Sequence, residues 1–328
     1  MDVKNSFMIS EFVLLGLTST WELEIFFFCI FLLTYAAIMA GNLFIVIMVT
    51  CDSHLHSKPM YFLLGNLSFL DMSISTITTP KMITDFLREK KTISLWGCMA
   101  QMFFLHFLGG SEMTLLIVMA VDHYIAICKP LHYTSIMSCR VLVGSGLLSW
   151  AVGFVHTMSQ MVFTVTLPFC GPNVVDDIFC ELPLVIKLAC TETYVLELLV
   201  IADSGLLSFT CFTLLLISYT VILVTVPHGS SDGLSRALST LSAHITMVTL
   251  FFGPCIFIYT WPFSILSMDK FLSVFYSVIT PLLNPIIYTL RNREMKSAMS
   301  RMKTQCINFR HTFWTTTMKM NGISGKLM

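Results

Sequence analysis

Residues 25–51 read IFFFCIFLLTYAAIMAGNLFIVIMVTC, a stretch without Asp, Glu, Lys or Arg that is bounded by Glu24 and Asp52. About 20 apolar residues are enough to cross the hydrocarbon layer of a membrane as an α-helix. Inside a membrane every backbone N–H and C=O needs an internal partner, which a helix provides. This stretch therefore predicts a membrane-spanning helix.

Six further stretches of the same kind follow along the chain. Only two of them contain a charged residue, which is Asp71 in one and Glu112 in the next. The alternating pattern of a membrane β-barrel is missing. We therefore predict an all-α membrane protein, a seven-transmembrane helix bundle with spans at residues 25–51, 59–79, 92–121, 141–163, 204–226, 237–261 and 271–290.

The composition agrees with this prediction. Hydrophobic residues make up 55% of the 328 residues and charged residues only 12%, whereas soluble domains carry about 25% charge. A soluble globule of this composition would expose large apolar patches. The 19 basic residues equal the 19 acidic ones, so no overall positive field is present to attract nucleic acid.

The distribution of Lys and Arg predicts the orientation of the bundle, because basic residues concentrate on the cytoplasmic side. With the N-terminus outside and the C-terminus inside, 12 basic residues fall on inner segments and 7 on outer ones. Residues 1–24 would then be extracellular and lack the pattern of a cleavable signal peptide. Residues 25–290 would form the transmembrane domain, 291–305 a basic amphipathic juxtamembrane helix, and 306–328 a cytoplasmic tail.

Four of the eleven cysteines fall at or beyond the predicted outer face: Cys98, Cys170, Cys180 and Cys190. An even number of cysteines facing an oxidising compartment predicts two disulfides. Four cysteines allow three pairings, and the sequence alone does not choose among them.

Short motifs mark the ends of the predicted helices. They are GN at 41–42, LHS at 55–57, PMYF at 59–62, MAVDHYIAIC at 119–128, KPLHY at 129–133, SY at 218–219, RALSTLSAH at 236–244, PLLNPIIY at 281–288 and LRN at 290–292. On these motifs the chain resembles the odorant receptors among the rhodopsin-like G-protein-coupled receptors. The sequence of residues 5–305 is most similar in its motifs to the family-4 branch of class II.

The resemblance implies a receptor of the plasma membrane and not an enzyme. It implies a small volatile odorant as ligand, a stimulatory G protein of the olfactory type as partner, and a rise in cAMP as output. It also implies the disulfide pairs Cys98–Cys180 and Cys170–Cys190. An intramembrane enzyme would need catalytic motifs such as HExxH, which are absent, and a transporter would show internal repeats, which we do not find.

The resemblance further implies an odorant pocket in the outer half of the bundle. Stripes of Met and aromatic residues taken alone predict plain core, so the pocket assignment rests on the resemblance. Buried polar tips need partners, which favours His106 and Tyr259 as hydrogen-bonding contacts, with His156 a further polar candidate. Asp203 either orients a ligand or pairs with His106 or Lys187. The candidate contacts are Met102, His106, Gly109, Gly110, Met113, Asp203, Leu207, Phe252, Cys255 and Tyr259.

Asp71 and Glu112 are the deepest acids of the predicted bundle, and an ionised carboxylate inside a span is costly. One interpretation is a sodium or proton site, to which Asn42 and Asn284 add neutral oxygens. The other is a pair of neutral, hydrogen-bonded carboxyls, because two nearby carboxylates disfavour joint ionisation. No other cofactor is expected.

The resemblance assigns a last set of residues to activation and G-protein coupling: Asp122, His123, Tyr124, Tyr219, His244, Asn284, Pro285 and Tyr288. His123 stands where the family has Arg, and His is shorter and mostly neutral near pH 7. Lys58 is inserted before Pro59, Leu241 replaces the usual Cys, and the amino-terminal sequon at Asn5 is lost. These departures leave open a non-signalling or weakly coupled protein with the receptor fold.

Overall fold

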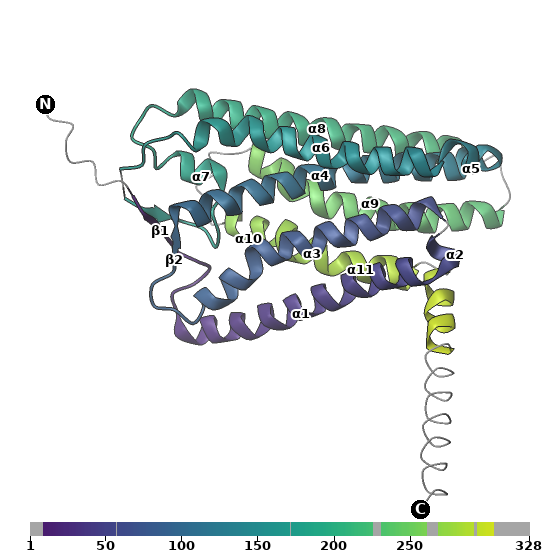
Figure 1. The fold of residues 1–328 in the computed structure, drawn as a ribbon, viewed down its shortest axis with the longest axis horizontal. Coiled ribbons are helices and arrows are strands. Elements are labelled where there is room, and N and C mark those ends of the chain that lie inside the picture. The colour runs from purple at the N-terminus through teal and green to yellow at the C-terminus, as the bar shows by residue number, and fades with distance from the viewer. Residues whose placement is uncertain are drawn as a thin grey trace, which may run out of the picture.

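The computed structural model describes residues 9–56, 58–170, 172–225, 231–260, 268–291 and 294–304. Long helices in these ranges run side by side as one bundle (Figure 1). In the described part of the chain they make seven long helical segments, the number that the uncharged stretches predict. The segments are α1 (Trp21–Cys51), α3 (Pro59–Asp85), α4 (Leu95–Cys128), α6 (Cys139–Thr164), α8 (Tyr194–Thr225), α9 (Ser231–Thr260), and a last one made of α10 (Met268–Val274), the π-helical turn η3 (Phe275–Ile279) and α11 (Thr280–Arg291).

Much of the apolar surface of these helices faces outward. Six segments are long and apolar enough to cross a membrane: α1, α3, α4, α6, α8 and Lys270–Ile287. In α1 the spanning window has a mean hydropathy of 2.3, yet only 22% of it is buried. Such a surface would drive aggregation in water, so lipid is its solvent. The chain is a mostly helical, multi-pass membrane protein with at least six apolar spans.

Helix α9 belongs to the same bundle, although its described apolar part, His244–Phe257, is shorter than a full span. It packs against α8 and α11. Met247, Val248 and Phe251 of α9 are buried in the core that α3, α4 and α8 also fill. Tertiary packing of an apolar face, which supplies most helix stability, therefore holds α9 in place.

Most of the helices begin or end several residues away from the uncharged stretches of the sequence, and the starts of α8 and α4 show why. Helix α8 begins at Tyr194, ahead of the predicted span, because the helix tolerates Asp203 within it. Residues 92–94 were predicted to be helical and form a strand instead. Ser94 then caps α4, since its hydroxyl accepts a hydrogen bond from the Gly97 N–H at 3.1 Å.

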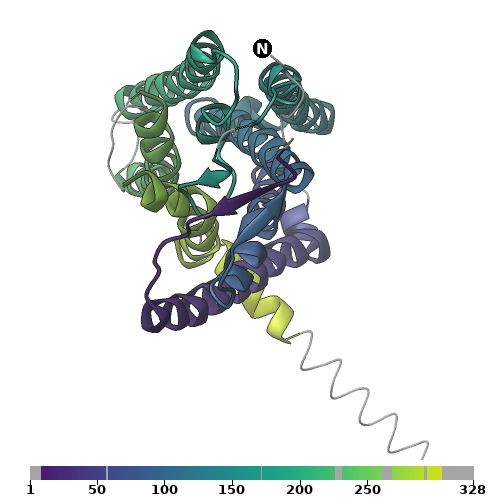
Figure 2. The same cartoon turned by 90° about the vertical axis from the view of Figure 1, so that its left-hand side faces the viewer.

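A small sheet lies across one end of the bundle (Figure 2). Its order is β2-β1-β3, from β1 (Glu11–Leu14), β2 (Thr92–Ser94) and β3 (Val174–Val175). Strand β1 pairs antiparallel with β2 and parallel with β3. Phe12 and Leu14 are buried beneath it, beside the short helix α7 (Leu182–Ile186). The N-terminal segment thereby covers this end, which we call the disulfide end because both disulfides lie there.

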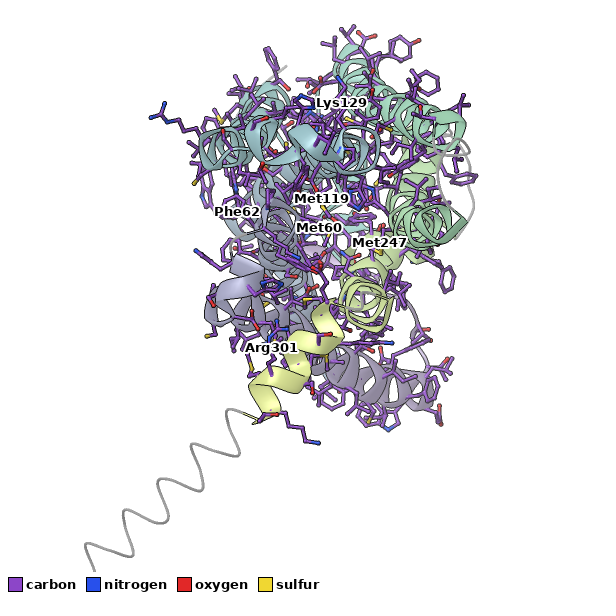
Figure 3. The ribbon with its side chains drawn as sticks, turned by 90° about the vertical axis from the view of Figure 1, so that its right-hand side faces the viewer. Met60, Phe62, Met119, Lys129, Met247 and Arg301 are labelled. Carbon is purple, nitrogen blue, oxygen red and sulfur yellow. A yellow bond between two sulfur atoms is a disulfide. The ribbon has the colours of Figure 1, made fainter. Side chains whose placement is uncertain are left out.

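Short helices α2 (Ser53–His56), η1 (Pro130–His132) and α5 (Tyr133–Ile136) close the opposite end. Residues 294–304 form a helix there that turns away from the bundle axis (Figure 1). Its Met295 and Ala298 are fully buried in the core. Figure 3 views the molecule from this end and places Arg301 on that helix.

Ion pairs anchor the helix at residues 294–304. The Lys58 Nζ lies 2.7 Å from Glu294 Oε1, and the Tyr61 hydroxyl donates to Glu294 Oε2 at 2.9 Å. Partial burial raises the pKa of Glu294, but these hydrogen bonds outweigh it and hold the pKa below its usual value. Arg301 likewise bonds Asp52 at 2.8 Å. Lys58, the inserted residue, thus has a structural partner.

Candidate functional site

Two disulfides fix the long loop between α6 and α8 at the disulfide end. Cys98, in the first turn of α4, is joined to Cys180, and Cys170 is joined to Cys190. These are the pairs that the resemblance implies. The first bond ties the loop to α4, so residues 179–183 descend toward the bundle axis and become the roof of a cavity.

The cavity lies between the helices below this roof. Its volume is about 70 Å³, several times the ~10–15 Å³ that one water molecule needs. Most of its wall is apolar, as is typical of small-molecule sites. The lining residues come from α3, α4, the loop, α6, α8, α9 and η3: Ile74, Leu105, His106, Gly109, Gly110, Met113, His156, Phe179, Cys180, Glu181, Leu182, Pro183, Ser204, Phe251, Cys255 and Tyr276.

About half of the predicted contacts line this cavity. They are His106, Gly109, Gly110, Met113 and Cys255, joined by the further polar candidate His156. An alanine methyl at Gly109 would meet no atom within 4 Å, so this glycine leaves the cavity open.

The other predicted contacts are placed elsewhere. Met102 and Phe252 are fully buried in core clusters and Leu207 packs against the core, so none of the three lines the cavity. In this structure their helical spacing therefore serves core packing. A stripe of Met and aromatic residues, taken alone, predicts this role. The side chain of Tyr259 lies outside the described residues.

Asp203 pairs with neither of the two partners expected from the sequence. Its Oδ2 lies 3.1 Å from His156 Nδ1, and it accepts hydrogen bonds from Ser159 at 3.0 Å and Gln160 at 3.2 Å. The side chain is 45% exposed, at the rim between α6 and α8. Asp203 therefore acts on the cavity through His156, which does line it.

Glu181 is a cavity residue that sequence reasoning missed, because an acidic residue in a long loop is usually solvated. Its Oε1 accepts hydrogen bonds from the Ser273 hydroxyl at 2.6 Å and from the Tyr276 hydroxyl at 2.7 Å. The signal available in the sequence is its position next to Cys180, since the disulfide to α4 must draw the neighbouring residue inward. The loop is thereby bonded to the seventh helical segment.

Asp177 is a second loop acid that is buried instead of solvated. It is fully buried, and burial together with the nearby Glu181 carboxyl raises the pKa of Asp177 well above its usual value. Asp176 remains outside and pairs with Lys270 at 2.5 Å. The roof of the cavity is thus held by polar contacts as well as by disulfides.

A seam of buried polar side chains lies deeper, between α1, α3, α4 and the seventh segment. The Asn284 amide donates to both oxygens of Asp71, at 2.9 and 2.7 Å. Asn42 donates to the Pro281 carbonyl at 3.0 Å, and Ser75 to the Ser277 carbonyl at 3.2 Å. All of these residues are buried. Polar networks of this kind are specific because every member depends on the others.

The seam has oxygen atoms that could coordinate a monovalent cation. Asn42 Oδ1, Asn284 Oδ1 and Glu112 Oε2 are buried oxygens without a hydrogen-bond partner among the described residues. No cluster of three or more His, Cys, Asp or Glu side chains that suits a transition metal occurs in those residues. Oxygen ligands favour hard cations, so the residues fit sodium, and they fit a shared proton equally well.

At the opposite end the predicted activation residues meet between α4, α8 and α9. The His123 ring stacks on the His244 ring with centroids 4.9 Å apart and planes inclined by 3°. A hydrogen bond of 2.8 Å joins His244 to the Tyr219 hydroxyl. Asp122 accepts a hydrogen bond from the Tyr133 hydroxyl at 2.8 Å.

The remaining activation residues are placed less centrally. Tyr124 packs against the edge of the core, and Leu241, in the place of the usual Cys, is buried. Pro285 lies inside α11 and against Gly41, where an added methyl would sit 3.1 Å from the proline ring. The side chain of Tyr288, the lost sequon at Asn5 and the tail 306–328 lie outside the described residues.

Comparison with known proteins identifies this arrangement. A family model described as "Olfactory receptor" matches residues 28–306. Human olfactory receptor 4L1 is 65% identical over 313 residues, which cover 95% of this chain and 100% of the relative. Human olfactory receptor 4K13 is 63% identical, covering 92% and 99%, and human olfactory receptor 4K14 is 60% identical, covering 94% and 100%. The chain belongs to the olfactory receptor family, in its family-4 branch, and is therefore a G-protein-coupled receptor and not an enzyme.

Proposed function

We propose that this receptor binds small volatile odorants in the cavity below the loop and activates a stimulatory G protein of the olfactory type, which raises cAMP. The observation that carries the proposal is the cavity itself. It is apolar, it is roofed by a disulfide-held loop, and its walls come from every long helical segment except α1. Few charges line it, which suits small and mostly apolar ligands.

Helix α9 is the element that connects the cavity to the opposite end. Phe251 and Cys255 of α9 line the cavity, and His244, two turns earlier, stacks on His123 of α4. A ligand that contacts both α4 and α9 stabilises whichever arrangement of the two helices fits it better. A receptor responds to such differential affinity by a shift in population, and the change at His244 opens the face for the G protein.

The proposed orientation places the disulfide end outside the cell and residues 294–304 at the inner leaflet of the plasma membrane. Disulfides persist in the oxidising extracellular compartment. Lys296, Arg301 and Lys303 lie on the short helix and suit the anionic inner leaflet. The division into 1–24, 25–290, 291–305 and 306–328 follows from this orientation.

A second candidate function is a receptor fold that binds ligands but couples weakly or not at all. The placement of His123 favours it. The ring is 4% exposed, its Nδ1 donates to the Met119 carbonyl at 2.5 Å, and its face is covered by His244. A side chain held in this way offers no forked, charged group to a G protein.

A cAMP reporter assay tests the proposal in cells that express the olfactory G protein and a trafficking chaperone. A broad odorant panel is applied to the wild type, to Gly109→Leu, which fills the cavity, and to Gly144→Leu, whose position on α6 is open. We expect a dose-dependent response that Gly109→Leu abolishes and Gly144→Leu retains at equal surface expression.

Other outcomes separate the alternatives. A response that survives Gly109→Leu would contradict the cavity assignment. Silence in the wild type, with odorants that raise the thermal stability of the purified receptor, would favour the non-signalling candidate.

A further inference from the structure

His106 carries a hydrogen-bonding atom that the protein leaves without a partner. Its Nδ1 lies 2.9 Å from the Met102 carbonyl oxygen. A carbonyl only accepts, so the proton must be on Nδ1, and in a neutral imidazole Nε2 is then an acceptor. A doubly protonated, charged His106 ring without a counter-charge in this apolar wall would be far more costly than the neutral ring. Nε2 is buried and has no hydrogen-bond partner among the described residues.

His156, the second imidazole of the cavity wall, has the same tautomer. Its Nδ1 lies 3.1 Å from the Asp203 carboxylate, which only accepts, so Nε2 of His156 is also an acceptor. The two rings lie near each other on α4 and α6, with centroids 6.3 Å apart and planes inclined by 38°. The Gln160 side-chain amide lies 3.4 Å from His156 Nε2 and occupies that acceptor, so His106 Nε2 is the ring nitrogen on this side that the described residues leave without a partner.

The other side of the cavity holds a carboxylate that is already hydrogen-bonded. Glu181 reaches the lining from the loop, and two hydroxyl groups donate to its Oε1. Donors at a carboxylate stabilise its ionised, acceptor-only form. The hydroxyl proton of Tyr276 is directed at this oxygen and not at the cavity. The lining also holds the Ser204 hydroxyl, whose oxygen accepts from Gln160 at 2.6 Å, and the Cys255 thiol, while most of the remaining wall is apolar. Among these polar groups, His106 Nε2 is the buried acceptor that the described residues leave without a partner.

We propose that the cavity selects small apolar alcohols and phenols, and that His106 Nε2 accepts the hydrogen bond of the ligand hydroxyl. This inference rests on the proposed function of the cavity as the odorant site. Aldehydes, ketones, esters and ethers offer only acceptors, so they leave His106 unpaired. Carboxylates would meet the like charge of Glu181. A site that is arranged to bond a hydroxyl rejects analogues that lack it.

Gly109 sets the space in front of this acceptor. It lies three residues after His106 on α4, lines the cavity and has no atom within 4 Å of an added methyl. A methyl group at this position reduces the volume for every ligand without changing the polar groups. Gly109→Ala is thus the matched control for a change in hydrogen bonding at His106.

The test measures binding and not signalling. Purified full-length receptor is heated with matched compounds on the same skeletons: linear C6–C10 alcohols, their methyl ethers and the corresponding aldehydes, together with phenol, anisole and benzaldehyde. We expect the hydroxyl compounds to raise the melting temperature at concentrations about tenfold or more below their ether and aldehyde counterparts, since one unpaired buried acceptor distinguishes the sets. His106→Phe should remove this preference, and Gly109→Ala should lower all affinities and keep it.

Equal shifts by ethers or aldehydes, or no shift by any hydroxyl compound, would overturn the inference. A His106→Phe variant that keeps the preference would overturn the role of His106, and His106→Gln, which retains an acceptor, shows whether loss of folding explains a negative result. The cAMP assay is run in parallel. Signalling driven only by carbonyl compounds contradicts this inference and leaves the proposed function standing. Binding of alcohols without any cAMP signal supports this inference and contradicts the signalling part of the proposed function.

Discussion

At the scale of single residues, the replacement of Arg by His at position 123 is the most consequential feature of the chain. An arginine at this position would be permanently charged and long, and its natural partner would be the adjacent Asp122. His123 instead lies flat on His244, and Asp122 turns to Tyr133. The contact between α4 and α9 is therefore a stack of two rings instead of an ion pair.

His123→Arg should increase G-protein activation. Burying the charged guanidinium in the small space over His244 is costly, so we expect it to leave the stack and become available at this end of the bundle. We expect a several-fold larger ligand-stimulated cAMP response at equal surface expression, measured over full concentration–response curves.

His132→Arg is the matched control, because it adds the same side chain to an exposed position on η1 at the same end. An unchanged response in His123→Arg, or an equal gain in both variants, would show that the residue at position 123 does not limit coupling.

At the scale of elements, the packing of α4 on α6 depends on glycines that face each other. A methyl group on Gly153 would lie 2.2 Å from the Ser111 hydroxyl and 2.4 Å from the Phe107 carbonyl. A methyl group on Gly110 would lie 3.1 Å from the Gly153 Cα. Small residues of this kind let membrane helices approach closely. The approach places His106 and His156 on the same cavity wall.

Gly153→Ala should destabilise the receptor by about 1–3 kcal/mol, because the added methyl overpacks against backbone that cannot move aside. Gly144→Ala on the same helix meets no atom and should be neutral or stabilising by about 0.5–1 kcal/mol, since alanine favours the helix. Thermal unfolding of the two purified variants decides this. Similar melting temperatures would show that α4 and α6 separate at little cost.

At the scale of the whole molecule, the polar seam joins the first, second, third and seventh helical segments at one level. Asp71 is the central acceptor, held by Asn284, while Asn42 reaches the Pro281 carbonyl next to it. Buried ionisable groups within spans are costly and generally functional. The seam therefore couples the arrangement of these helices to whatever balances the charge of Asp71 and Glu112.

Sodium should stabilise the wild-type receptor if a cation fills this role. Binding to the folded state adds about 1.4 kcal/mol of stability when the sodium concentration is ten times Kd. The melting temperature should rise in sodium chloride relative to potassium chloride at the same ionic strength. Asp71→Asn should abolish this difference, whereas Asp52→Asn, outside the seam, should retain it. No sodium effect in the wild type would favour the shared proton.

The part of the site that could be predicted from the sequence is a face of α4, which helical spacing defines and which the family resemblance assigns to the pocket. His106, Gly109, Gly110 and Met113 share one face of α4, and all four line the cavity. Met102 on the same stripe of α4 and Phe252 on α9 are buried in the core instead. Periodicity identifies a face of a helix but not what that face meets.

The sequence by itself determined the membrane class, the number of long helices and the family, because uncharged length and short motifs are local properties that survive in any arrangement of the helices. Only the tertiary structure decided which polar groups meet. It turned Asp203 toward His156, Glu181 toward Tyr276 and His123 onto His244. These contacts join positions far apart along the chain, so they depend on the rotation and approach of whole helices, which the packing of all seven fixes together.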